Sequence, residues 1–234
     1  MTENAETAPK PPLWRLASEA ATILPLGLNT LRAAVEAKGD GQGWPVMVLP
    51  GFTTDDNSTS LLRRSLDRAG FHSYGWDMGF NLGLRPGLVE RLEKRVEAIA
   101  ALEQRKVILL GWSLGGLFAR ALGHRIPGHV AQVVTLSSPF SGSRHANRAW
   151  RLYNLINDHT VDELPDGFEF TAKPPVPTIA VWTARDGIVD PSSARGRPEE
   201  ADLALELDVT HFGYGGTAHG VRQVVELLAA NLPA

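Results

Sequence analysis

One short run of residues has the types and spacing needed for nucleophilic catalysis. It reads Gly111-Trp112-Ser113-Leu114-Gly115-Gly116 and follows an unbroken apolar stretch typical of a buried strand. The pattern G-x-S-x-G between a strand and a helix is typical of a nucleophile elbow, a strained turn that exposes the serine hydroxyl. Side chains at positions 111 and 115 would collide there with neighbouring backbone. We therefore predict that Ser113 is a nucleophile that forms an acyl-enzyme.

Such a nucleophile needs backbone donors for the oxyanion that develops on the substrate. The elbow directs the N–H group of Leu114 to this position, and the helix that begins there adds partial positive charge. The second donor is expected in the loop after the first core strand. There the backbone N–H of Phe52 follows Gly51, which allows close approach. The alternative is that this loop is a simple turn.

A serine hydroxyl is essentially never ionised at neutral pH, so Ser113 also needs a base. Of the seven histidines, all but His72 follow Ser113 in the chain. His211 comes two residues after the last predicted strand, at the carboxyl edge of the sheet, where ligands bind in open α/β sheets. We predict that His211 is the base. His219, eight residues later at the start of the last helix, is the alternative.

The imidazole needs an acid that holds its tautomer and stabilises the imidazolium. Asp186 follows the strand predicted at residues 177–183 and is the residue expected in this role. The alternative is Asp190, four residues later, which could instead cap a loop before Pro191.

The elements that must position these residues alternate along the chain. Short apolar runs predict strands at residues 45–49, 73–76, 106–110, 130–136, 177–183 and 203–209. Amphipathic stretches predict helices at residues 58–69, 86–104, 114–124 and 220–231. This alternation favours an α/β fold, a doubly wound, mostly parallel sheet of about six core strands covered on both sides.

Two regions depart from the alternation. Residues 1–44 are predicted to be a tail followed by two short helices within residues 13–38, split by Pro25 and Gly27. This segment could pack on the core, cover the site or contact a membrane surface; the last is disfavoured because its polar face lacks basic density. Residues 45–234 form the main domain, with a small cap inserted at about residues 140–175, since connections this long are usually functional lids or disordered.

Aromatic side chains near the elbow and in the cap are candidates for an acyl pocket: Trp112, Phe140, Trp150 and Tyr153. Each could equally be an ordinary core residue, because aromatic side chains usually pack.

Composition excludes several classes. The 23 Lys and Arg against 26 Asp and Glu give no basic excess for nucleic acid. The absence of Cys excludes a thiol nucleophile and thiolate metal sites, and we expect no metal and no cofactor. A secretory signal is not recognisable, and no apolar run approaches the ~20 residues that span a bilayer. These observations predict a cytoplasmic protein.

The chain resembles the α/β-hydrolase superfamily, and more narrowly its bacterial esterase- and lipase-like members. The resemblance spans roughly residues 45–232. It rests on Val46-Met47-Val48-Leu49-Pro50-Gly51-Phe52, on the elbow at residues 111–116 and on Asp186-Gly187-Ile188-Val189.

The resemblance implies a serine hydrolase that cleaves small-molecule or lipid-like carboxylic esters with Ser113, Asp186 and His211. A thioesterase or serine acyltransferase would share all of these motifs. A dehalogenase is disfavoured because that chemistry needs a carboxylate in place of Ser113. A non-catalytic binding protein is disfavoured because all three candidate residues are present. Acyl length and oligomeric state stay open.

Overall fold

A computed structural model of the chain describes residues 11–143, 154, 160 and 168–233. Six strands form one sheet, in which every neighbouring pair is parallel. Their order across the sheet is β2-β1-β3-β4-β5-β6. The strands are β1 (Pro45–Leu49), β2 (His72–Gly75), β3 (Val107–Trp112), β4 (Val130–Leu136), β5 (Thr178–Trp182) and β6 (Leu203–Glu206). The predicted doubly wound α/β fold is confirmed.

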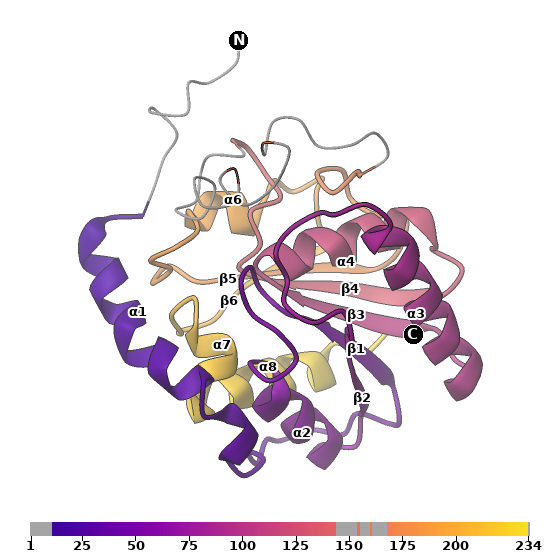
Figure 1. The fold of residues 1–234 in the computed structure, drawn as a ribbon, viewed down its shortest axis with the longest axis horizontal. Helices are drawn as coiled ribbons and strands as arrows, with labels where there is room; N and C mark the ends of the chain where they lie inside the picture. Colours follow the sequence, from indigo (N-terminus) through magenta and orange to yellow (C-terminus); the bar gives the residue numbers. More distant parts are fainter. Residues whose placement is uncertain (1–10, 144–153, 155–159, 161–167, 234) are drawn as a thin grey trace.

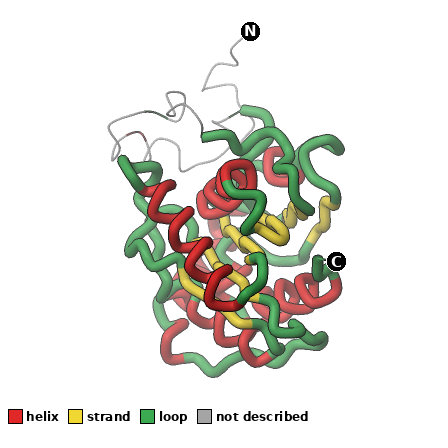
Figure 2. The backbone as a smooth tube through the Cα atoms, turned by 90° about the vertical axis from the view of Figure 1, so that its right-hand side faces the viewer, coloured by secondary structure: helices red, strands yellow, loops and turns green. Residues whose placement is uncertain are grey.

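Helices cover both faces of this sheet (Figures 1 and 2). One face packs against α2 (Ser60–Arg68) and α8 (Ala218–Ala230), and the other against α3 (Leu88–Glu103) and α4 (Leu114–Arg125). Burial alternates along β1, because Val46 and Val48 belong to the first apolar cluster whereas Met47 and Leu49 belong to the second. A strand buried on both faces has a continuous run of apolar residues in its sequence. All five residues of β1 are apolar and buried.

Two strands end two or more residues away from the predicted position, whereas β2 and β5 end within one residue of it. β3 continues to Trp112, because residues 111 and 112 stay paired with β4, and it therefore ends directly before Ser113. β6 ends at Glu206 instead of residue 209. The chain turns away there, and the Thr183 hydroxyl donates to the carbonyl of Val209 (2.6 Å). Among the helices whose bounds the structure describes, the short α6 (Pro191–Arg195) and α7 (Gly213–Gly216) were not predicted.

The prediction of two helices in residues 13–38 is wrong for its second half. One helix, α1 (Leu13–Leu26), runs through Pro25, and only a single 3-10 turn, η1 (Asn29–Leu31), follows. The chain beyond η1 uses its backbone for tertiary contacts instead. Val35 N–H donates to Ser65 Oγ (2.9 Å), and Lys38 N–H donates to Glu226 on α8 (3.0 Å). These bonds hold the segment along α2 and α8.

The predicted cap at about residues 140–175 lies largely outside the described residues. The last part of this segment, from residue 168, is described. It is bound by Arg120 of α4, which is fully buried. The guanidinium donates to the carbonyls of Phe170, Thr171 (2.9 Å), Ala172 (3.0 Å) and Glu200 (2.9 Å). Burial lowers the pKa of Arg120 to about 10. No described helix is both long and apolar enough to cross a bilayer.

Candidate active site

The site predicted from the sequence lies where the strand order reverses. β1 is flanked by β2 and β3, so the connection after β1 leads to one side of the sheet and the connection after β3 to the other. Such a switch point leaves room for a ligand at the carboxyl ends of the two strands. Phe52 follows β1 and Ser113 follows β3, so both candidate residues emerge at this point.

Ser113 has the strained backbone expected of an elbow. Its φ of 54° and ψ of −121° lie in a backbone region that residues other than glycine rarely occupy. The turn is held on both sides, because Ser113 N–H donates to Leu136 O (2.8 Å) and Gly116 N–H donates to Ser113 O (3.0 Å). Leu114 is the first residue of α4, where backbone N–H groups lack intrahelical acceptors.

The glycines around Ser113 are required by close backbone contacts. A Cβ atom on Gly111 would lie 2.4 Å from the Cα of Gly116, and one on Gly115 would lie 2.3 Å from Leu49 O. A Cβ on Gly116 would lie 1.9 Å from Ser138 Oγ. All three distances are too short for any side chain, so the elbow brings α4, β1 and the end of β4 together more closely than another residue would allow.

Replacement of Gly115 with Ala is therefore expected to destabilise the fold by about 1–3 kcal/mol, because the new methyl group overlaps the backbone of β1. Chemical denaturation followed by circular dichroism measures the change. Gly128→Ala is the matched control, because nothing lies within 4 Å of a Cβ at that position. A Gly115→Ala variant as stable as the control would contradict the close packing of the elbow.

His211 and Asp186 form a buried pair. The Nδ1 atom of His211 lies 2.8 Å from Asp186 Oδ2, and the two side chains are 2% and 1% exposed. The other oxygen of Asp186 accepts the N–H groups of Ile188 and Val189, both at 2.8 Å. An ionised carboxylate only accepts, so Nδ1 carries the proton of this bond and Nε2 is left as an acceptor.

The surroundings of His211 hold its loop in place and raise its pKa. The indole Nε1 of Trp112 donates to the carbonyl of His211 (3.0 Å), which ties the loop of His211 to the end of β3. Burial lowers the pKa of His211, but the negative charge of Asp186, its hydrogen bond and the charge of Glu19 outweigh this effect. The pKa of His211 is thus raised above the usual value for histidine.

Ser113 directly follows Trp112, which contacts His211, but Ser113 itself is not hydrogen-bonded to the pair. The ring of Trp112, the residue before Ser113, lies 5.8 Å from the imidazole ring, centroid to centroid. No hydrogen bond joins Ser113 Oγ to His211 in this structure, in which both residues are described. Hydrogen bonds in catalytic sites without substrate are often long and tighten when the substrate binds.

The loop after β1 approaches the elbow closely. A Cβ atom on Gly51 would lie 3.4 Å from the Cβ of Ser113. Asn81, which is fully buried, holds this loop: its amide donates to Pro50 O (2.8 Å), and its backbone carbonyl accepts Thr53 N–H (2.7 Å). Thr53 has a positive φ of 60°. Asn81 leaves no local signal in the sequence, because its contacts with the loop span about 30 residues.

The alternative acid and base lie elsewhere. Asp190 caps α6 by accepting Ser192 N–H (2.9 Å), and His219 is exposed on α8. The candidate pocket residues Trp112 and Phe140 are buried in apolar clusters, 3% and 1% exposed. Trp150 and Tyr153 lie outside the described residues.

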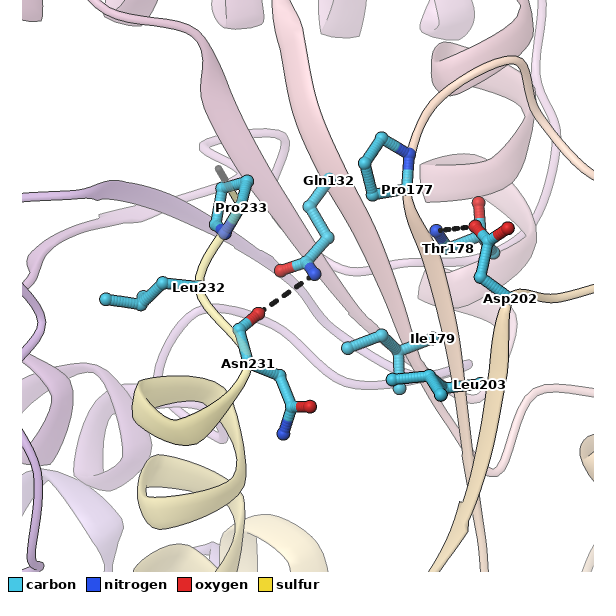
Figure 3. Close-up of a pocket in the computed structure, with 9 residues that line it drawn as sticks. All are labelled: Gln132, Pro177, Thr178, Ile179, Asp202, Leu203, Asn231, Leu232 and Pro233. Atoms are coloured by element: carbon cyan, nitrogen blue, oxygen red, sulfur yellow. Dashed lines mark hydrogen bonds between the residues drawn. The ribbon is translucent and has the colours of Figure 1, made fainter.

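A cavity of about 220 Å³ lies at the opposite end of the sheet (Figure 3). Its lining includes Thr178 and Leu203, the first residues of β5 and β6, together with Gln132 near the start of β4. It therefore lies at the amino ends of the strands, away from the elbow. Among the side chains that the structure describes, no group of three His, Cys, Asp or Glu is arranged to hold a metal ion.

A family model described as the alpha/beta hydrolase fold matches residues 45–155. The solved structures similar to this chain include a monoacylglycerol lipase of Paleococcus ferrophilus, with a TM-score of 0.55 and 19% identity over 82% of this chain and 96% of that one. They also include the naproxen esterase (carboxylesterase NP) of Bacillus subtilis, with a TM-score of 0.56 and 16% identity over 82% and 85%. The chain thus has the α/β-hydrolase fold, and the predicted resemblance is confirmed.

One curated relative is similar in sequence. It is a pimeloyl-[acyl-carrier protein] methyl ester esterase of Shewanella sp. (strain MR-7), 28% identical over 178 residues. The match covers 72% of this chain and spans 65% of the length of that relative.

Proposed function

We propose that the chain is a serine hydrolase that cleaves carboxylic esters through an acyl-enzyme on Ser113. The observation that carries this proposal is the buried hydrogen bond between His211 and Asp186 (2.8 Å), together with the strained turn at Ser113, whose neighbour Trp112 donates to the carbonyl of His211. The curated relative and the esterases and lipases of similar fold support the ester class of substrate.

In this reaction the Nε2 atom of His211 takes the proton of the Ser113 hydroxyl as the oxygen attacks the ester carbonyl. The N–H groups of Phe52 and Leu114 stabilise the oxyanion. The imidazolium, held by Asp186, then gives its proton to the leaving alcohol. Water enters, His211 accepts its proton, and hydrolysis of the acyl-enzyme regenerates Ser113. No step requires a metal ion or an organic cofactor.

Labelling with a fluorophosphonate probe tests the nucleophile. The probe is expected to modify the protein at Ser113, located by peptide mass spectrometry, and to leave the Ser113→Ala variant unmodified. Circular dichroism spectra of the two proteins should coincide. An unlabelled wild type, or equal labelling of the variant, would overturn the proposal.

A series of p-nitrophenyl esters from acetate to palmitate, assayed beside the matched thioesters, defines the substrate class. Preference for the oxygen esters supports an esterase, and preference for the thioesters indicates a thioesterase. Transfer of the acyl group to an added alcohol in place of water indicates an acyltransferase on the same residues.

A further inference from the structure

The N-terminal helix α1 places one carboxylate against both loops that carry the buried pair. Glu19 is the only acidic residue of α1 and is fully buried. Its Oε1 atom accepts Gly187 N–H (3.0 Å) and His211 N–H (2.8 Å), and its Oε2 atom accepts Phe212 N–H (3.0 Å). Gly187 directly follows Asp186, so one side chain joins the backbone beside the acid to the backbone of the base.

These three N–H groups are the partners that offset burial of the Glu19 carboxylate. Within the described chain, Glu19 forms no ion pair with Lys or Arg. An unpaired buried charge is costly, and several N–H donors can stabilise it only when they are held in place. The donors come from two loops 25 residues apart in sequence, the separation of Asp186 and His211. The carboxylate and the two loops therefore fix one another.

The packing of α1 on these loops is close. A Cβ atom on Gly187 would lie 2.7 Å from Arg15 O and 2.9 Å from Glu19 Cγ, and one on Gly216 would lie 2.6 Å from Thr22 O. Thr22, one helical turn after Glu19, adds a neutral contact through its hydroxyl, 3.0 Å from that of Thr210. Figure 1 shows α1 alongside α7, which follows the His211 loop.

We propose that Glu19 is a positioning residue of the active site, which sets the distance and orientation between His211 and Asp186 through the backbone of both loops. This inference rests on the proposed function for its kinetic consequences, but the positioning itself concerns the pair alone. Helix α1 then belongs to the catalytic apparatus, although it precedes the first core strand.

The charge of Glu19 also acts on the imidazole. Among the described residues, two charged groups act on His211, namely Asp186 from the loop after β5 and Glu19 from α1. Tyr214 from α7 interacts with the same two carboxylates. Burial raises the pKa of Tyr214, so its phenol stays neutral. Of the anions that the structure describes beside the imidazolium, removal of the charge of Glu19 therefore leaves Asp186. The pKa of His211 should fall, and the rising limb of the pH–rate profile should move to lower pH.

The test compares Glu19→Gln with Thr22→Val, a neutral change on the same helix that also loosens its contact with the His211 loop. In Glu19→Gln only the carbonyl oxygen can accept, so the amide NH₂ must face either Phe212 N–H or the N–H groups of Gly187 and His211. We expect kcat/KM for a p-nitrophenyl ester to fall about 10- to 100-fold, the cost of a small misplacement, and the rising limb to move to lower pH. Thr22→Val should lower the melting temperature without moving the limb.

Proton NMR supplies a readout that needs no activity. The Nδ1 proton shared by His211 and Asp186 should resonate far downfield in the wild type, in Ser113→Ala and in Thr22→Val, and should shift or broaden in Glu19→Gln. Glu19→Asp, which keeps the charge but is one methylene shorter, should give intermediate changes and replaces Glu19→Gln if that variant does not fold.

A Glu19 variant with lowered melting temperature but an unchanged pH profile and Nδ1 resonance would overturn the inference and leave the hydrolase proposal intact. If the wild type hydrolyses no ester and resists the probe, the proposed function fails. The NMR comparison then decides by itself whether Glu19 positions the pair.

Discussion

Replacement of His211 with Ala is expected to lower kcat for ester hydrolysis by about 10⁶-fold, the loss that follows removal of the base from a serine–histidine–aspartate site. Without the imidazole, the Ser113 hydroxyl keeps its proton and the leaving alcohol has no proton donor. Steady-state kinetics on a p-nitrophenyl ester measure the loss, with circular dichroism to show that the variant is folded.

The same variant should be less stable. Loss of the imidazole leaves Oδ2 of Asp186 buried without its partner, and breaking a buried charged pair costs about 3–5 kcal/mol. Because the folded-state pKa of His211 is raised, the pair contributes most below the ordinary pKa of histidine. The stability gap between wild type and variant should therefore narrow as the pH rises through the raised pKa.

His219→Ala is the matched control, since His219 is exposed on α8 and has no part in the proposed chemistry. It should keep wild-type kcat and a stability within about 0.5 kcal/mol of the wild type. Loss of activity in His219→Ala with retention in His211→Ala would assign the base to the other histidine and contradict the proposed mechanism.

Replacement of Asp186 with Asn should lower kcat by about 10⁴-fold with a smaller effect on the fold. The amide oxygen can still accept Ile188 and Val189 N–H, so the loop keeps its conformation. The amide NH₂ then faces Nδ1 of His211 and favours the tautomer with the proton on Nε2. An imidazole in that tautomer cannot accept the Ser113 proton, although all the residues stay in place.

Kinetics and NMR of the histidine ring nitrogens check this prediction together, because the kinetic loss should accompany the change of tautomer. Asp190→Asn is the control: Asp190 caps α6 and lies outside the pair, so kcat should not change. Wild-type activity in Asp186→Asn would show that the buried carboxylate has no role in orienting the base.

Local patterns in the sequence were enough for much of the fold. The strand and helix at residues 107–125 were predicted within two residues at each end, because a continuous apolar run and a glycine-rich turn are local signals. The segment after Pro25 was mispredicted as a helix. The segment has a helical pattern but is not helical, because the backbone N–H groups of Val35 and Lys38 donate to side chains of α2 and α8 instead.

By itself, the sequence determined the class of fold and the turn that carries Ser113, since both depend on residues adjacent in the chain. It left two histidines and two aspartates as candidates. Only the tertiary structure paired His211 with Asp186 and buried them, while it left His219 exposed. It alone placed Glu19 against the loop of His211, whose N–H donates to this carboxylate across 192 residues of sequence. A contact of that span leaves no local pattern, because it exists only once α1 has packed on the finished sheet.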